Sequence, residues 1–317
     1  MVAANKVGRF PKWAVMMAAV AAVGALAAGV VVRMRATPEP PAETPWVPPD
    51  QQVAVPAYIP PDFHPDEWTR LIAADPAKVS LVVANVASGP GDAISPAWRD
   101  VMTRARSSGK RVLGYVDTGY LGLTGQADRA GSTDAASWSR QVEQDVDAWY
   151  SLYPGLIDGI FFDRGATDCG ANNGNAELYQ RANQRQKERH AGSMTVLNPG
   201  TAVPQCFEDA ADILVTCESS YEGYMAHAEE PGVQNYHDPG WHPRDPRKFW
   251  HIVHGVPAGQ AEQVLARSRE RGAGYVYVTD KELPNPYETL PGAPMWSTEV
   301  STVSGVEPTT PVATAAG

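Results

Sequence analysis

Cysteine is scarce in this chain. The three cysteines among 317 residues, Cys169, Cys206 and Cys217, are too few for a disulfide scaffold. Cys169 follows the predicted strand at 159–163, and Cys206 follows the next predicted strand, at 195–198. Cys217 lies inside the predicted strand at 213–218. In an oxidising compartment we therefore predict one disulfide between Cys169 and Cys206, with Cys217 buried and free. Three unpaired thiols are the alternative.

Motifs for several function classes are also missing. The sequence contains neither a Gly-x-Ser-x-Gly elbow nor a P-loop, so acyl transfer and nucleotide hydrolysis have no support. Five histidines fall in one stretch: His227, His237, His242, His251 and His254. Their spacing matches no helical or finger-type metal motif, and Pro239, Pro243 and Pro246 indicate a loop there. We therefore predict no metal site.

Positive charge is sparse outside the N-terminus. Residues 1–35 contain five basic residues and no acid, and without them the formal net charge changes from -10 to -15. An acidic surface repels phosphate backbones and anionic lipid headgroups, and it tolerates neutral or cationic polymers. We therefore expect no nucleic-acid partner.

The N-terminal segment, residues 1–35, reads as a membrane anchor. Its uncharged run of 19 residues, Ala14 to Val32, is long enough to span a bilayer. A signal peptide cleaved after Ala25-Leu26-Ala27 is the alternative. Both interpretations place the following domain outside the cell. Residues 36–50 contain six prolines and predict a semi-rigid linker.

Eight short apolar runs recur between residues 51 and 296. They are 53–58, 80–85, 111–117, 159–163, 195–198, 213–218, 249–254 and 274–279. Helical patterns separate several of them, notably after Pro96, around Trp138 to Trp149, and from Ala261 to Ser268. Eight strands alternating with helices over roughly 250 residues predict a single α/β domain, a (β/α)8 barrel. An open doubly wound sheet is the alternative, although its glycine-rich phosphate turn is missing. Residues 297–317 show no periodicity, and we predict a disordered tail.

Polar residues end all eight runs. They are Tyr58, Asn85, Asp117, Asp163, Asn198, Glu218, His254, and Thr279 with Asp280. In a barrel the carboxyl ends of the strands converge on one face, which is where such enzymes place their chemistry. Loops also begin with polar residues, and this simpler explanation accounts well for Asn85, Asn198 and Asp280, but poorly for the whole ring.

Asp163 and Glu218 are the candidate catalytic pair. They end the fourth and sixth runs, and alternate strands of a barrel point side chains into the same layer. Two strand spacings put the backbones roughly 10 Å apart, so the carboxylates reach the separation used by glycosidases. One carboxyl would protonate the leaving oxygen, and the other would act as nucleophile or base.

The remaining polar ends and nearby aromatic residues are candidates for binding substrate. We assign this role to Tyr58, Asn85, Asp117, Tyr120, Asn198, Tyr221 and His254. Asp117 ends an odd-numbered strand, so we expect it to bind a sugar hydroxyl or to turn the loop. Tyr224 and Trp241 also lie at predicted loop positions where aromatic rings stack on sugars, but for any single one of these aromatic residues the favoured explanation is packing in the core.

Six stretches resemble spherulation-specific family 4, the spherulin-4-like proteins. They are 55–58, 83–91, 112–120, 158–163, 197–200 and 218–221, in family order across the predicted domain. The resemblance implies a (β/α)8 glycoside hydrolase without metal or organic cofactor. Characterised fungal relatives cleave α-1,4-linked N-acetylgalactosamine within galactosaminogalactan, a polymer of cell surfaces and biofilms.

The same resemblance implies catalytic roles for Asp163 and Glu218. Fungal members can carry a second acid directly after the first, where this chain has Arg164. We expect an exported, monomeric, endo-acting glycosidase of an amino-sugar polysaccharide. A non-catalytic carbohydrate-binding or structural barrel is the alternative.

Overall fold

Eight parallel strands form the centre of the computed structural model, which describes residues 50–226, 239–245 and 247–305. The strands are β1 (Gln52–Val55), β2 (Val79–Ala84), β3 (Arg111–Asp117), β4 (Gly159–Asp163), β5 (Met194–Asn198), β6 (Ile213–Ser220), β7 (Phe249–His254) and β8 (Tyr275–Val278). They pair in sequence order, and β8 returns to β1 through the pairs Gln52↔Tyr275 and Val53↔Val276. The sheet is therefore a closed barrel, which confirms the predicted fold and excludes the open sheet.

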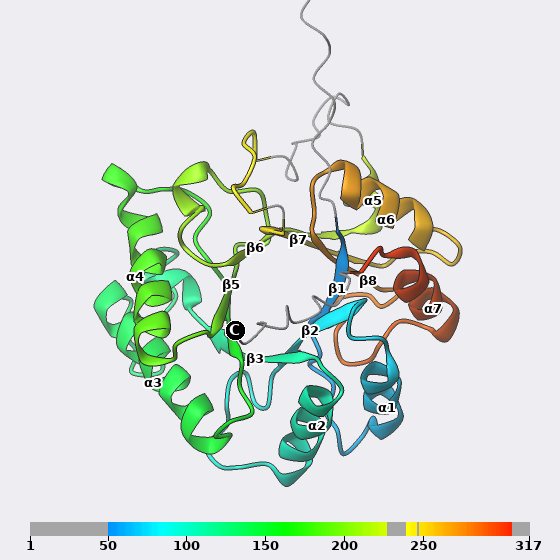
Figure 1. Cartoon of the computed structure of the whole chain (residues 1–317). Helices are drawn as coiled ribbons and strands as arrows, with labels where there is room; N and C mark the ends of the chain where they lie inside the picture. Colours follow the sequence, from blue (N-terminus) through cyan, green and yellow to red (C-terminus); the bar gives the residue numbers. More distant parts are fainter. Residues whose placement is uncertain (1–49, 227–238, 246, 306–317) are drawn as a thin grey trace, which may run out of the picture. The chain divides into compact units, whose positions relative to one another are not determined.

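Helices cover the outside of the barrel (Figure 1). They are α1 (Pro65–Ala73), α2 (Pro96–Ser107), α3 (Ala135–Leu152), α4 (Gly174–Arg189), α5 (Tyr221–Met225), α6 (Ala261–Glu270) and α7 (Ala293–Thr302), with short 3-10 helices η1 (Gly119–Gly122), η2 (Ala171–Asn173) and η3 (Gln205–Phe207). The three helices expected from the sequence pattern are present as α2, α3 and α6. Ser95 caps α2 by accepting a hydrogen bond from the amide of Trp98.

The strands are buried on both faces because side chains fill the barrel and helices cover it. Inside, Phe161 stacks on Tyr115 with ring centroids 6.2 Å apart and meets Trp250 edge to face at 5.7 Å. Outside, Gly114 allows close contact with α3, since a Cβ at this position would lie 2.6 Å from the Trp149 ring. Trp149 donates its indole N–H to the carbonyl of Tyr115 at 2.7 Å. The interior is thus a packed core that leaves its polar strand ends at one edge.

The folded part extends beyond the expected end at residue 296. Helix α7 continues to Thr302, and its Glu299 and the following Val303 are buried. The amide of Gly305 donates to the carbonyl of Gln51, which joins the end of the described chain to the start of β1. The prediction of disorder from residue 297 is therefore wrong as far as Gly305, because contacts with β1 and β8 order a segment of weak periodicity. Residues 306–317 lie outside the described ranges.

Other expectations fall outside the described residues as well. These are the anchor or signal segment, 1–35, and all of the proline-rich linker except Asp50. Among the residues that the structure describes, no helix combines the length and the apolar character needed to cross a bilayer.

Candidate active site

Asp163 and Glu218 lie close together at the carboxyl ends of β4 and β6. Asn198, at the end of the intervening strand β5, donates its side-chain N–H groups to both. Its Nδ2 atom lies 2.8 Å from Asp163 Oδ1 and 2.8 Å from Glu218 Oε2. The facing carboxylate oxygens are therefore separated by no more than twice this distance. The predicted pair and one predicted binding residue form a single hydrogen-bonded group.

Two tyrosines complete the hydrogen bonding of the carboxylates. Tyr115 on β3 donates its hydroxyl to Asp163 Oδ2 at 2.7 Å, and Tyr287 donates to Glu218 Oε1 at 2.6 Å. Burial, followed by the nearby carboxylates, raises the pKa of both phenols, so they remain protonated donors at neutral pH. All four carboxylate oxygens consequently accept a hydrogen bond from a fixed side chain.

A third tyrosine, Tyr58, connects the two donors. Its ring meets Tyr115 edge to face at 5.4 Å and Tyr287 at 5.6 Å. Burial chiefly, with a further contribution from Asp163, raises the pKa of Tyr58. The sequence pattern places Tyr58 at the end of the first strand, but β1 ends at Val55 because Pro56 has no amide hydrogen to continue the ladder. Tyr58 lies in the following loop and still faces the other tyrosines.

The electrostatics of the site also change the pKa of Asp163. Burial, and then the charge of Glu218, raise the pKa of Asp163 to about 6. Hydrogen bonds from Tyr115, from the Arg164 amide and from Asn198 act in the opposite direction. The balance leaves Asp163 able to hold or release a proton close to neutral pH, as a general acid requires.

The backbone beyond Asp163 turns sharply. Arg164 has a φ of 57°, in the left-handed region that few non-glycine residues adopt. Its carbonyl accepts a hydrogen bond from the Thr118 hydroxyl at 2.8 Å and another from the Tyr120 amide at 2.9 Å. Tertiary contacts therefore hold the residue in this conformation.

Asp117 and Asn85 shape loops at the same edge of the barrel. Asp117 pairs with Asp163 in the β3–β4 register, accepts the Gly119 amide at 2.8 Å and lies 3.5 Å from the Arg164 guanidinium. Asn85 accepts the Gly89 amide at 3.0 Å. The Asp117 carboxylate and the Asn85 carboxamide thus each bind a nearby backbone amide. Their contact with substrate stays a prediction.

The other expected binding residues lie at or just after the carboxyl ends of β3, β6 and β7. Tyr120 lies in η1, Tyr221 begins α5, and His254 ends β7, each partly buried. None of the three has a hydrogen bond to Asp163 or Glu218 among the described residues. Tyr224 is fully buried and binds His251 Nδ1 through its hydroxyl at 2.9 Å, so it packs in the core, as favoured above for any single one of these aromatic residues.

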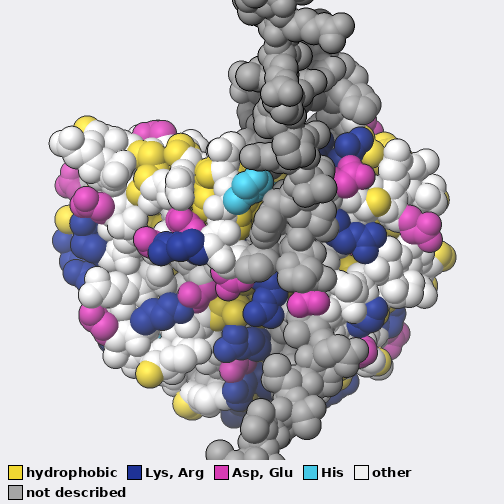
Figure 2. Space-filling model, turned by 45° about the horizontal axis from the view of Figure 1, so that its top comes forward, with side chains coloured by type: hydrophobic (Ala, Val, Ile, Leu, Met, Phe, Trp, Pro, Cys, Tyr) yellow, Lys and Arg dark blue, Asp and Glu magenta, His cyan; other side chains and the backbone are white. Residues whose placement is uncertain are grey.

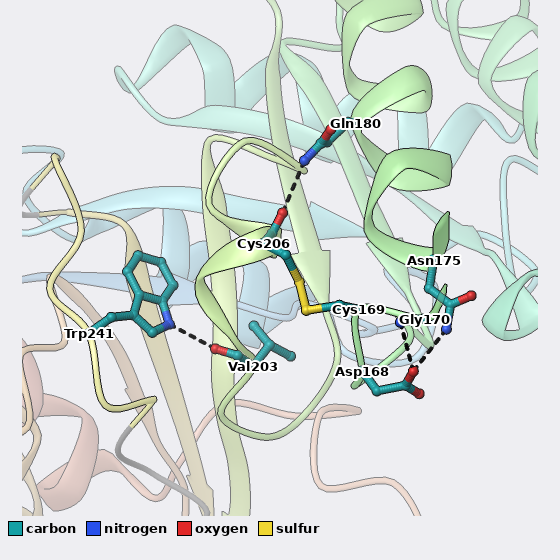
Figure 3. Close-up of a disulfide and its surroundings, with 8 residues drawn as sticks. All are labelled: Asp168, Cys169, Gly170, Asn175, Gln180, Val203, Cys206 and Trp241. Atoms are coloured by element: carbon teal, nitrogen blue, oxygen red, sulfur yellow. Dashed lines mark hydrogen bonds between the residues drawn. A yellow bond between two sulfur atoms is a disulfide. The ribbon is translucent and has the colours of Figure 1, made fainter. Parts of the chain in front are cut away.

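Trp241 contacts Val203 and Phe249 and makes no hydrogen bond to the carboxylates among the described residues. Its indole N–H donates to the carbonyl of Val203 at 2.8 Å (Figure 3), and its ring meets Phe249 edge to face at 5.2 Å. The ring therefore packs against Phe249, the first residue of β7. This contact connects the segment before β7 to the loop after β5.

A disulfide joins Cys169 to Cys206, across the loops that follow β4 and β5 (Figure 3). Its Cα atoms are 6.1 Å apart, within the usual range for such bonds. Cys217 is buried and free. Both cysteine loops adjoin strands that carry site residues, so the crosslink connects the segments on either side of α4 and β5.

Sequence reasoning missed Tyr115 and Tyr287. Tyr115 could have been found, because it lies two residues before Asp117 and so points to the same side of its strand. Tyr287 follows β8 in a loop without regular structure, 69 residues from its partner Glu218. No periodic signal connects the two. Within the described ranges, no three His, Cys, Asp or Glu side chains are grouped as metal ligands.

Solved structures with the same fold include carbohydrate-active proteins. Sph3 of Aspergillus clavatus, crystallised in complex with GalNAc, is 22% identical, with a TM-score of 0.59, over 80% of this chain and 97% of that chain. A family 39 glycoside hydrolase of Bacteroides cellulosilyticus WH2 is 11% identical, with a TM-score of 0.51, over 81% of this chain and 64% of the other. At these identities the likeness shows the barrel fold.

The search of curated proteins found no match to this sequence. The model of one protein family, Spherulation-specific family 4, matches residues 52–303. This range includes all eight strands, both carboxylates, Asn198 and the tyrosines that bind them. The chain therefore belongs to Spherulation-specific family 4.

Proposed function

We propose that this protein is a glycoside hydrolase that uses Asp163 and Glu218 to cleave an amino-sugar polysaccharide. The observation that carries the proposal is the pair of carboxylates bridged by one Asn198 nitrogen at the mouth of the barrel. Two like charges held this close repel each other, which benefits a catalyst more than a passive binding surface. Family membership and the GalNAc complex of Sph3 support the same conclusion.

The separation of the carboxylates favours a retaining mechanism. Their facing oxygens each lie 2.8 Å from the same nitrogen, which agrees with the spacing of about 5 to 5.5 Å in retaining glycosidases. Inverting enzymes need about 6.5 to 9.5 Å to accommodate a water molecule. In this scheme Glu218 attacks the anomeric carbon while Asp163 gives its proton to the leaving oxygen. Asp163 then takes a proton from the water that releases the sugar from Glu218.

The proposed substrate is an α-1,4-linked N-acetylgalactosamine polymer cut at internal bonds. The resemblance to fungal relatives and the sugar bound by Sph3 support this choice. The acidic net charge of the chain disfavours polyanionic substrates. Arg164, which replaces the second acid of some fungal members, pairs with Asp117 and is the residue where sugar specificity could differ.

We also propose that the domain acts outside the cell, as a monomer attached through residues 1–35. The Cys169–Cys206 disulfide supports an oxidising compartment. The mass of the mature protein tests the anchor. A mature N-terminus near Ala28 would show a cleaved signal peptide, and a complete N-terminus in the membrane fraction supports the anchor.

The decisive experiment measures reducing ends released from galactosaminogalactan by the full-length protein. Asp163→Asn and Glu218→Gln should each lower turnover by at least about 100-fold. Asp117→Asn is the matched control, and it should chiefly raise KM. NMR of the first product should show the α anomer. Binding of the polymer by the wild type without any cleavage would instead identify a carbohydrate-binding barrel.

A further inference from the structure

A cavity lies on the outside of the barrel, between α3 and α4. Its volume is 370 Å³, within the range of small-molecule sites, about 300 to 1,000 Å³. Apolar side chains form its floor: Leu121, Val142, Val146, Phe162 and Leu178. This floor can accept an apolar group of limited size, such as one short acyl chain, and is too small for a lipid with two long chains.

Arginines surround the entrance of this cavity. They are Arg140 on α3 and Arg181, Arg185 and Arg189 on α4. The three on α4 form exposed ion pairs with Glu177, Glu143 and Asp147. Figure 2 shows basic and acidic side chains interspersed along the left edge of the molecule, the side on which α3 and α4 lie in Figure 1.

Arg140 supplies the excess positive charge at the entrance. It is exposed, and its guanidinium makes no ion pair within the described part of the chain, although the Asp128 carboxylate lies within electrostatic range and offsets part of its charge. Exposed ion pairs of this kind contribute little stability, so the neighbouring arginines can also turn toward an incoming anion. The entrance is therefore complementary to one negative charge.

The inner wall of the cavity determines how a ligand would be oriented. Thr118 and Tyr179 form part of this wall, and their hydroxyls are engaged in the protein. Thr118 donates to the carbonyls of Asp163 and Arg164, each at 2.8 Å, and Tyr179 accepts the Ala166 amide at 3.0 Å. With these hydroxyls engaged, the wall presents mainly carbon to the cavity. An apolar tail fits the inner end, and the charged head belongs at the arginines.

We propose that this cavity binds a free single-chain anionic amphiphile, of the class of medium-chain carboxylates. The carboxylate lies among the arginines of α3 and α4, and the chain extends over the apolar floor toward Phe162. Because Thr118 and Phe162 also support the segment that carries Asp163, the ligand contacts the back of the catalytic strand from outside the barrel. This site is separate from the carboxylate pair and does not depend on the proposed glycosidase activity.

The test is isothermal titration calorimetry of the full-length protein with decanoate, below its micelle concentration. Decyltrimethylammonium, which has the same chain length and the opposite charge, is the ligand control. Decanoate should bind at one site, and the cationic amphiphile should bind at least about tenfold more weakly. Absence of decanoate binding, or equal affinity for both amphiphiles, would overturn the proposal.

Variants test the charged entrance and the apolar cavity separately. Arg140→Gln should weaken decanoate binding about three- to tenfold, whereas Arg104→Gln on α2, also an exposed helical arginine, should leave it unchanged. Ala182→Phe fills the cavity from α4 and should weaken binding at least about tenfold. Ala136→Phe does the same from the exposed side of α3, where folding is not at risk. If folded protein with either phenylalanine binds decanoate like the wild type, the ligand lies elsewhere.

Discussion

At the scale of single residues, the protonation of Asp163 has a measurable effect on stability. Its pKa in the folded protein is about 6, above the usual value near 4. The folded state therefore binds more protons than the unfolded state between these two pH values. Its free energy of unfolding must fall as the pH rises through this window. The full cost, up to about 3 kcal/mol, is present above pH 6.

Asp163→Asn removes this cost. We expect the unfolding free energy of the variant, relative to wild type, to increase between about pH 4 and pH 6 and then to level off. Urea denaturation at a series of pH values measures this difference, and groups that titrate equally in both proteins cancel. A difference that stays constant with pH would show that the folded state does not raise the pKa of Asp163.

A second prediction at this scale concerns the phenol of Tyr287. Tyr287→Phe removes the hydrogen bond to Glu218 Oε1 and leaves the ring contact with Tyr58 in place. A hydrogen bond to a charged group contributes about 1.5 to 3 kcal/mol, so kcat should fall at least about tenfold with little change in KM. Tyr150→Phe is the control, since Tyr150 binds Gln186 on α4, away from the carboxylates. Equal kinetics for Tyr287→Phe and wild type would exclude a positioning role.

At the scale of elements, the disulfide connects the loops on either side of α4 and β5. Cys169 and Cys206 are 37 residues apart, and closing a loop of this length stabilises the fold by roughly 2 to 4 kcal/mol. The double variant Cys169→Ser/Cys206→Ser should lower the unfolding free energy by this amount in guanidinium chloride denaturation. Cys217→Ser, which alters a buried free thiol, is the comparison. Added reductant should destabilise the wild type and leave the double variant unchanged.

The strands were predictable from the sequence to a greater extent than the loops. Buried apolar runs ending in polar residues indicate β3, β4 and β7 to the residue, because a strand buried on both faces leaves a continuous hydrophobic signal. The pairing of Asp163 with Glu218 followed from the alternation of layers in a barrel. Tyr287 and the end of α7 depend on contacts between distant parts of the chain, which no local pattern encodes.

At the scale of the whole molecule, helix α7 and the residue that follows it bind the barrel through hydrogen bonds to distant parts of the chain. Glu299 accepts the amide of Val278 on β8, and Lys78 donates to the carbonyl of Val303. A chain that stops at residue 296 loses these bonds and the buried Val303, whereas one that stops at residue 305 keeps them. We expect the shorter chain to be less stable by at least about 3 kcal/mol. Thermal denaturation of the two proteins side by side measures this, and equal midpoints would contradict it.

The position of Tyr287 has a consequence for biosynthesis. Both carboxylates and Asn198 are already present in a nascent chain of 218 residues, but the phenol that binds Glu218 is added 69 residues later. At about 5 to 20 residues per second, translation needs several seconds more to supply it. The strand that closes the barrel, β8, is made in the same interval. A growing chain thus contains its acids well before it can hold them in working geometry, so hydrolytic competence should arise only near the end of synthesis.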